Sequence, residues 1–158
     1  MYNLKRKQIL PITLEEAWEF FTSPKNLSKI TPSDMGFDIQ YISGGDTTYP
    51  GQIIAYKIKV LPGIRMNWVT EITQVKDLQY FIDEQRFGPY KLWHHQHHFR
   101  GIKEGVEMID EVNYVIPLGV LGKLAHWLFV GRQVNAIFDY RYKVLASFFN
   151  TKNNLSTY

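Results

Sequence analysis

The stretch GPYKLWHHQHHF, residues 88–99, begins with a turn-forming Gly-Pro pair and continues as a row of alternating side chains. In a β-strand successive side chains point to opposite faces, so residues two apart share a face. One face then carries Trp93, His95, His97 and Phe99. The other carries His94, Gln96, His98 and Arg100. Because aromatic residues stand at both ends of the first face, we predict a strand over residues 91–100 that directs His95 and His97 inward.

Similar segments lie on both sides of this strand. A period of two runs through residues 37–43, 51–60, 65–76, 79–86 and 106–116. Glycine, proline or aspartate interrupts the pattern between most of them, and such short breaks favour antiparallel pairing of consecutive strands. Residues 3–10 predict one more strand. The sequence therefore predicts a curved antiparallel sheet of about seven strands.

Two short helices are predicted between the strand at 3–10 and the strand at 37–43. Thr13, followed three residues later by Glu16, forms the capping-box signature of a helix N-terminus. This helix is expected to end near Ser23-Pro24. A second is expected over residues 24–30, before Pro32.

Residues 118–149 predict a long C-terminal helix with two apolar stripes. Leu121, Leu124 and Leu128 form the first stripe, and the second runs from Val130 to Phe148. At helical periodicity the two stripes point in nearly opposite directions. The helix is therefore expected either to break near Gly131 or to be buried on two sides. Two packed segments would explain the pattern, and so would a first segment that covers the mouth of a cavity.

Composition limits the classes of function. The chain has 158 residues, of which 45% are apolar and 15% aromatic, enough for the core of one domain. The net charge is only +3 and the positive residues are scattered, which argues against a nucleic-acid partner. With no cysteine, disulfides, thiol catalysis and cysteine-based zinc sites are excluded. No apolar run approaches the roughly 18 residues of a membrane span and no signal peptide is visible, so we expect a cytoplasmic protein.

These elements predict an α+β protein of one domain, residues 1–149. A polar C-terminal tail over residues 150–158 is expected to be disordered. In this class the curved sheet packs against the long helix, and a hollow between the two layers is a natural ligand site.

Three stretches resemble a known family. They are LPITLEEAWEFFTSPKNLSKITP at residues 10–32, FIDEQRFGPYKLWHHQHHF at 81–99 and DEVNYVIPLGVLGKLA at 110–125. With them, the chain to about residue 149 resembles the START/Bet v 1-like superfamily, also called SRPBCC. Within it, the chain is similar to the polyketide cyclase/dehydrase-like and CoxG-like group of small proteins. The resemblance implies the helix-grip fold, but it does not select a function, since the superfamily includes lipid carriers, hormone receptors and cyclases.

A carboxylate is predicted beside the inward-facing histidines. On the strand at 106–116, Asp110 and Tyr114 share a mainly apolar face. A buried carboxylate needs a partner, so Asp110 is expected to approach His95 or His97 across the strand pair and raise that histidine's pKa. Three interpretations stay open. The cluster can brace two strands, form a polar patch on a pocket wall, or act as an acid–base pair.

Further side chains are expected at the pocket. Arg141 lies within an apolar helical stripe and needs a partner there, either Asp83 or Glu71 or an acidic group of a ligand. The predicted ligand-binding residues are His95, His97, Asp110, Tyr114, Trp93, Trp68, Phe81, Arg141, Phe138 and Leu128. We assign no catalytic residue at this point.

A metal site and the common hydrolase motifs find little support in the sequence. His-x-His on a strand can chelate, but the glutamate that cupins place after it is replaced here by Gly101 and Ile102. A third ligand would have to come from Asp110 or His126. No Gly-x-Ser-x-Gly elbow and no glycine-rich phosphate loop occurs. We therefore predict neither a metal nor another cofactor.

Three classes of function remain. The first is binding of a hydrophobic small molecule, such as a lipid, quinone, polyketide or aromatic compound, between the sheet and the C-terminal helix. The second is a cyclase or dehydratase that uses the His/Asp pair in the same cavity. The third is an interaction protein whose segment 119–131 makes transient contact with a membrane or a protein. We favour a binding protein over an enzyme.

Overall fold

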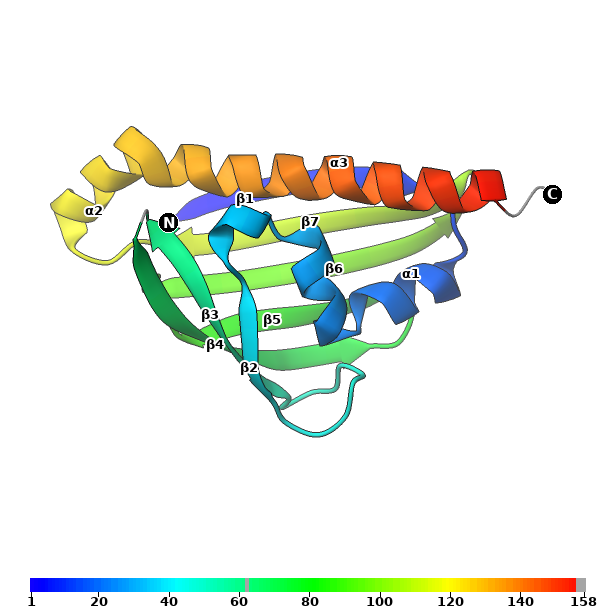
Figure 1. Cartoon of the computed structure of the whole chain (residues 1–158), viewed down its shortest axis with the longest axis horizontal. Helices are drawn as coiled ribbons and strands as arrows, with labels where there is room; N and C mark the ends of the chain where they lie inside the picture. The colour runs from blue at the N-terminus through cyan, green and yellow to red at the C-terminus, as the bar shows by residue number, and fades with distance from the viewer. Residues whose placement is uncertain (62, 156–158) are drawn as a thin grey trace.

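A single antiparallel sheet of seven strands forms the body of the molecule in the computed structural model, which describes residues 1–61 and 63–155. The strands are β1 (Tyr2–Leu10), β2 (Asp38–Ile42), β3 (Ile53–Leu61), β4 (Ile64–Lys76), β5 (Tyr80–Phe87), β6 (Leu92–Ile102) and β7 (Gly105–Val115). Their order in the sheet is β1-β7-β6-β5-β4-β3-β2 (Figure 1). Only β1 is placed out of chain sequence, because it pairs with β7 at the opposite edge from β2. The predicted α+β architecture is confirmed.

The helices follow in two groups. Behind β1 come α1 (Leu14–Phe21) and two 3₁₀ turns, η1 (Pro24–Ile30) and η2 (Ser33–Met35). At the C-terminus lie α2 (Gly119–Ala125), the π-helical turn η3 (His126–Val130) and α3 (Gly131–Leu155). The capping box predicted for α1 is present, since the Thr13 side chain accepts from the Glu16 backbone and the Glu16 carboxylate accepts from the Thr13 backbone.

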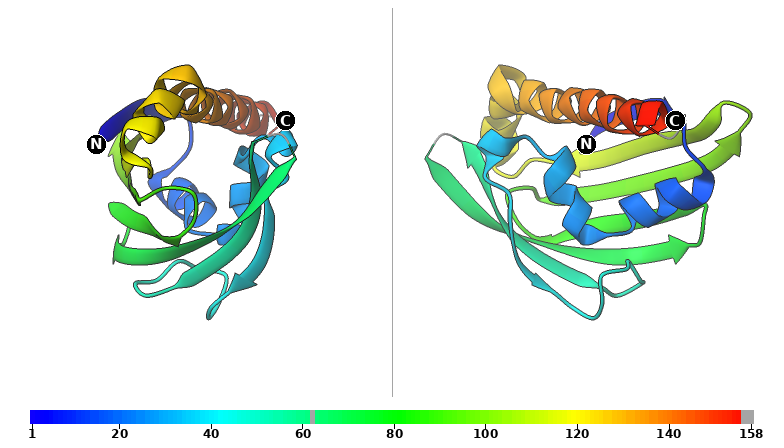
Figure 2. Two further views of the ribbon diagram at one scale, coloured as in Figure 1. Left: turned by 90° about the vertical axis from the view of Figure 1, so that its left-hand side faces the viewer. Right: turned by 45° about the vertical axis from the view of Figure 1, so that its right-hand side comes forward.

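The sheet curves strongly and α3 lies across its open side (Figure 2). The remaining gap is covered by α1 and η1, which pack against the same concave side. One apolar cluster joins α1 and the end of α3 to β6 and β7, with Leu10 and Phe149 at its centre. A second lies between β3 and β4 around Trp68. The polar residues of interest lie between these two clusters.

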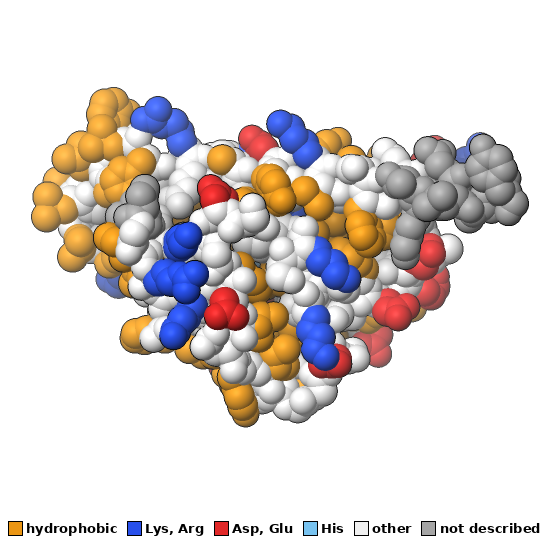
Figure 3. Space-filling view, viewed as in Figure 1, with side chains coloured by type: hydrophobic (Ala, Val, Ile, Leu, Met, Phe, Trp, Pro, Cys, Tyr) orange, Lys and Arg blue, Asp and Glu red, His pale blue; other side chains and the backbone are white. Residues whose placement is uncertain are grey.

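The C-terminal helix corrects one expectation. It does not break at Gly131, whose backbone is helical, and it is not buried on two sides. Val134 is buried against the sheet, whereas Leu121, Leu124 and Leu128 are exposed. The wider π-helical turn between the two stripes changes the phase of the helix, so only the second stripe packs on the sheet. Figure 3 shows hydrophobic side chains gathered at the end of the molecule where α2 lies.

Helix α3 extends to Leu155 and thus enters the segment 150–158 that was predicted as a disordered tail. Residues 156–158 lie outside the described residues, so the tail and the domain boundary stay predictions. No helix within the described residues is both long and apolar enough to cross a membrane.

Candidate functional site

A cavity of about 160 Å³ lies between the concave face of the sheet and α3. Most of its wall is apolar or aromatic. The aromatic part is formed by Tyr56, Trp68, Phe81, Tyr90, Trp93 and Phe138. One region of the wall is different, because charged and ionisable side chains meet there. These are Asp83, His95, His97 and Arg141.

Strand register brings two aspartates to the two histidines. On β6, His95 pairs with Asp83 of β5, while His97 pairs with Asp110 of β7 on the other side. All four side chains point to the concave face of the sheet. We call Asp83, His95, His97 and Asp110 the His–Asp quartet. Its members come from three adjacent strands, so the backbone hydrogen bonds of the sheet fix their positions.

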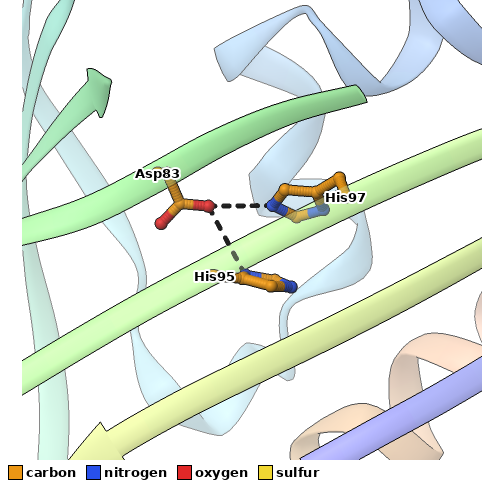
Figure 4. A group of neighbouring side chains, drawn as sticks. All are labelled: Asp83, His95 and His97. Atoms are coloured by element: carbon orange, nitrogen blue, oxygen red, sulfur yellow. Dashed lines mark hydrogen bonds and ion pairs between the residues drawn. The ribbon is translucent and has the colours of Figure 1, made fainter. Parts of the chain in front are cut away.

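Each carboxylate of the quartet lies between both imidazoles. His97 Nε2 donates to Asp83 Oδ2 at 2.8 Å, and His95 Nε2 donates to Asp110 Oδ1 at 2.9 Å. The other two imidazole nitrogens each lie close to a carboxylate oxygen without hydrogen-bond alignment. His97 Nδ1 lies 2.9 Å from Asp110 Oδ1, and His95 Nδ1 lies 3.4 Å from Asp83 Oδ2 (Figure 4 shows the Asp83 contacts). The two imidazole rings are 3.7 Å apart between their centroids.

Arg141 of α3 approaches the quartet at the cavity wall. Its guanidinium is 3.8 Å from Asp110 Oδ1 and lies over the Phe138 ring, 5.0 Å from the ring centroid. The residue is only 8% exposed, and its buried Nε has no hydrogen-bond partner among the described residues. A buried guanidinium donor without an acceptor is costly, so Arg141 keeps hydrogen-bonding capacity that the described residues do not use.

The quartet shifts the pKa values of its own members. Burial acts to raise the pKa of Asp83 and of Asp110, but the facing histidines outweigh it and hold both pKa values below the usual range. Burial acts to lower the pKa of His97, yet its contacts with both aspartates raise it. For His95, burial and the neighbouring His97 lower the pKa. These shifts keep both aspartates ionised at neutral pH and favour a proton on His97 over one on His95, beside the Arg141 guanidinium.

This charge distribution predicts a pH dependence of stability. Because the pKa of folded His97 is raised above 6.5, its stabilising contribution is complete below that pH and is lost as the pH rises through the folded value. The free energy of unfolding, measured with urea, should therefore decrease as the pH rises from about 6 to about 9. His97→Gln should remove most of that fall. His94→Gln, at a half-exposed neighbour bonded to Glu84, should keep it, and an equal slope in both variants would contradict the assignment of the proton to His97.

The same residues contain a possible chelating set. One ligand atom each from Asp83, His95 and His97 lies within 4.8 Å of the others. The sequence had suggested Asp110 or His126 as third ligand, but Asp110 bonds to His95, and His126 stacks on Tyr2 and bonds to the Tyr114 hydroxyl. All three atoms already take part in the quartet, and the Arg141 guanidinium adds a positive charge nearby. This arrangement suits protons better than a divalent cation.

Seven of the predicted ligand-binding residues line the cavity: His95, His97, Trp93, Trp68, Phe81, Arg141 and Phe138. Three do not. Asp110 lies behind the histidines, and Tyr114 is buried against the aromatic rings of Tyr2, Tyr90 and Trp93. Leu128 is the clear correction, because it lies 44% exposed on η3, outside the cavity that it was predicted to line.

The contact of Asp83 with the two histidines was not predicted from the sequence. It was expected only as a partner of Arg141, together with Glu71, and neither forms that pair. Asp110 is the acid nearest to Arg141, while Glu71 pairs with Arg86. A usable signal was present, because Phe81 and Asp83 share a strand face and Phe81 was already expected to point into the pocket.

No protein-family model and no curated protein sequence matches the chain. Solved structures with the same architecture do match. Protein CV1439 from Chromobacterium violaceum has a TM-score of 0.69 at 12% identity, over 94% of this chain and 98% of that one. Ara h 8.0201 has a TM-score of 0.58 at 14% identity, over 92% and 98%. The di-domain ARO/CYC StfQ from the steffimycin biosynthetic pathway has a TM-score of 0.70 at 10% identity, over 96% of this chain and 51% of StfQ.

At these identities the likeness shows the fold. The chain has the Bet v 1-like helix-grip fold that its sequence motifs predicted, and one copy corresponds to about half of StfQ. Function has to be argued from the cavity itself, since this fold carries different functions.

Proposed function

We propose that this protein binds a compact, largely aromatic small molecule with one acidic group in the cavity. The observation that carries the proposal is Arg141, a buried cation at the wall of a largely apolar cavity, whose guanidinium Nε lacks a hydrogen-bond partner among the described residues. A carboxylate or another acidic oxygen of the ligand would satisfy this donor. The aromatic rings of Trp68 and Trp93 would contact the rest of the molecule.

The size of the cavity narrows the ligand class. Sites for drug-sized molecules are roughly 300–1,000 Å³, and this cavity is smaller at about 160 Å³. A compact aromatic compound therefore fits better than a long-chain lipid. The Bet v 1-like fold supports a ligand-binding role in general, and StfQ belongs to a biosynthetic pathway. We place this binding function in the cytoplasm, in line with the absence of cysteine from the sequence.

Binding of an acidic ligand should be coupled to the uptake of a proton. An incoming carboxylate adds a negative charge beside Asp83 and Asp110. His95 is the group able to compensate it, since its imidazole is neutral and lies at the wall between two carboxylates. Binding of an acid would then raise the pKa of His95 and take up a proton, and affinity should increase as the pH falls.

Calorimetric titration with naphthoate tests the proposal. Saturable binding at one site is expected, with proton uptake visible as a difference between buffers of unlike ionisation enthalpy. Ile137→Phe should weaken this binding by about tenfold or more, because it places a larger side chain at the cavity wall. Ile9→Phe makes the same change at a half-exposed site on β1 outside the cavity and should leave binding unchanged. Equal affinities in the two variants, or no binding at all, would contradict the proposal.

Acid–base catalysis is a second candidate, favoured by the opposite shifts of two adjacent histidines. A neutral His95 can remove a proton next to a carbonyl group, and the His97 imidazolium can protonate a leaving hydroxyl, so that water is released and a carbon–carbon double bond forms. A β-hydroxy ketone bearing an aryl group is a suitable probe, because its conjugated product absorbs in the near ultraviolet. His95→Asn should abolish turnover and retain binding. If the protein converts this probe no faster than buffer does, the catalytic role is contradicted and only the binding function remains.

A further inference from the structure

One end of the molecule combines exposed apolar side chains from three separate turns. Antiparallel pairing places the β3–β4 turn, the β5–β6 turn and the β7–α2 connection at the same end, on the left in Figure 1. We call this end the apolar tip. Its exposed apolar residues are Ile64, Phe87, Leu92, Leu118, Val120, Leu121, Leu124, Trp127, Leu128 and Phe129. Trp127 is 76% exposed and Val120 is 79% exposed, so these side chains are largely in solvent.

The three turns that form the tip carry charges of one sign, and Asp34 and Asp38 lie next to them on η2 and β2. Residues 57–67, 85–93 and 116–134, which form the three turns and their flanks, contain no aspartate or glutamate. The same segments supply Lys57, Lys59, Arg65, Arg86, Lys91, Lys123 and Arg132. Of these, Arg86 is paired with Glu71 and Glu84. The net charge of +3 is thus distributed unevenly, although the positive residues are scattered along the sequence.

The opposite end has the opposite character. It is formed by α1, the β4–β5 turn and the β6–β7 turn, where exposed Glu15, Glu16, Glu19, Asp77 and Glu104 outnumber exposed Lys76 and Lys103. Acidic side chains appear on the right in Figure 3, away from the hydrophobic end. The molecule therefore has an electrostatic polarity along its length. A negatively charged surface would attract the tip and repel the other end.

The backbone at the tip is in an unfavourable conformation. Leu118 has a left-handed φ of 70°, and Gly119 follows with a φ of 53°. A left-handed conformation is unfavourable for a residue with a Cβ, and here it directs a leucine that is 78% exposed into solvent. The helix after this turn packs closely on it at Gly122. A Cβ at that position would come 2.0 Å from the Pro117 carbonyl oxygen, so only glycine fits there. The chain thus holds an apolar side chain outward by a turn that leucine disfavours.

We propose that the apolar tip docks on the surface of a bilayer that contains anionic lipid. The tip is a projection formed by turns and a short helix, a shape suited to insertion among lipid headgroups. Leucine, phenylalanine and tryptophan would enter the interface, and the surrounding lysines and arginines would contact anionic headgroups. Tyr90, Trp93 and Gln133 belong to the same segments and line the cavity, so the docked protein would hold the near end of the cavity at the membrane.

Vesicle co-sedimentation tests this proposal independently of any cavity ligand. The full chain is expected to bind phosphatidylcholine vesicles containing phosphatidylserine at least about tenfold more strongly than pure phosphatidylcholine vesicles. Salt should weaken the binding, because it screens exposed charges. The double variant Leu124→Glu with Trp127→Glu should reduce binding at least about tenfold, since both apolar contacts are lost and two negative charges are added.

A matched variant controls for added charge. Tyr41→Glu with Tyr142→Glu changes two exposed aromatic residues away from the tip, on β2 and α3, and should keep vesicle binding within about twofold of the original protein. All four positions are exposed, so circular dichroism should show an intact fold in both variants. No binding of the original protein to phosphatidylserine vesicles would overturn the proposal. Loss of concentration-dependent dimerisation in the tip variant would overturn it too, because the tip would then be a contact between two copies of the chain.

Discussion

Asp110→Asn is expected to lower the free energy of unfolding by about 3–5 kcal/mol, measured by urea denaturation below pH 6.5. The Asp110 carboxylate contacts both histidines of the quartet and is the acid nearest to Arg141. Asparagine keeps the shape of the side chain but removes the charge. The His97 imidazolium would keep only Asp83 as a charged partner, and the buried guanidinium would lose its nearest carboxylate.

The adjacent residue supplies the control. Glu111 lies on the opposite face of the same strand, where it forms an ion pair with Lys5 near the surface. Glu111→Gln removes the same charge and should cost no more than about 1 kcal/mol, because solvent screens such pairs. If the two substitutions have the same cost, the quartet does not stabilise the sheet and its charges are not those assigned here.

Arg141→Met should reduce the affinity for naphthoate by about 10–100-fold, because a charge-assisted hydrogen bond contributes roughly 1.5–3 kcal/mol. Methionine retains the length and apolar stem of the side chain but cannot donate to a carboxylate. Calorimetric titration with the neutral naphthamide provides the comparison, and its affinity should change less than about threefold. The variant also loses the ion pair with Asp110, so some loss of stability is expected, and circular dichroism should confirm that it is folded before titration.

Arg141→Lys separates charge from geometry. Lysine restores the positive charge without the planar fork of donors, so naphthoate affinity should fall between that of Arg141→Met and the original protein. Equal losses for naphthoate and naphthamide in Arg141→Met would mean that Arg141 shapes the cavity and does not recognise an acid.

Much of the fold could be predicted because the strands obey a simple periodicity. Trp93 and Phe99 identify the inward face of β6, and this placed His95 and His97 at the interior. Asp110 followed from the same argument on β7, and the structure confirms its contact with both histidines. Alternation along each strand is sufficient to predict this contact, because β6 and β7 follow each other in the chain and pair side by side.

The C-terminal helix could not be predicted to the same degree. A regular helix was assumed across Gly131, and the π-helical turn at His126–Val130 broke that assumption. Such a turn is set by tertiary packing, in this chain by His126 against Tyr2 and Tyr114, and has no local sequence signal. Leu128 was therefore assigned to the cavity, although it belongs to the exposed tip.

The contact partners of Asp83 and of Arg141 could not be predicted, because they depend on information that one sequence does not contain. The lateral register of β5 against β6 decides that Asp83 faces His95. The position of α3 along the sheet decides that Arg141 lies nearer to Asp110 than to Asp83. Both are set by packing between elements that are distant along the chain, and hydrophobic periodicity gives no distance between such elements.

A two-dimensional proton–nitrogen NMR titration with naphthoate tests the central claim most directly. Signals of the Arg141 Nε–H and of the indole N–H groups of Trp68 and Trp93 should shift together and saturate, because all three side chains line the cavity. The indole signal of Trp127, on the exposed tip, should stay unchanged. Shifts confined to Trp127 and its neighbours, with the cavity signals unmoved, would show that aromatic acids bind only to the surface and would contradict a ligand site beside the His–Asp quartet.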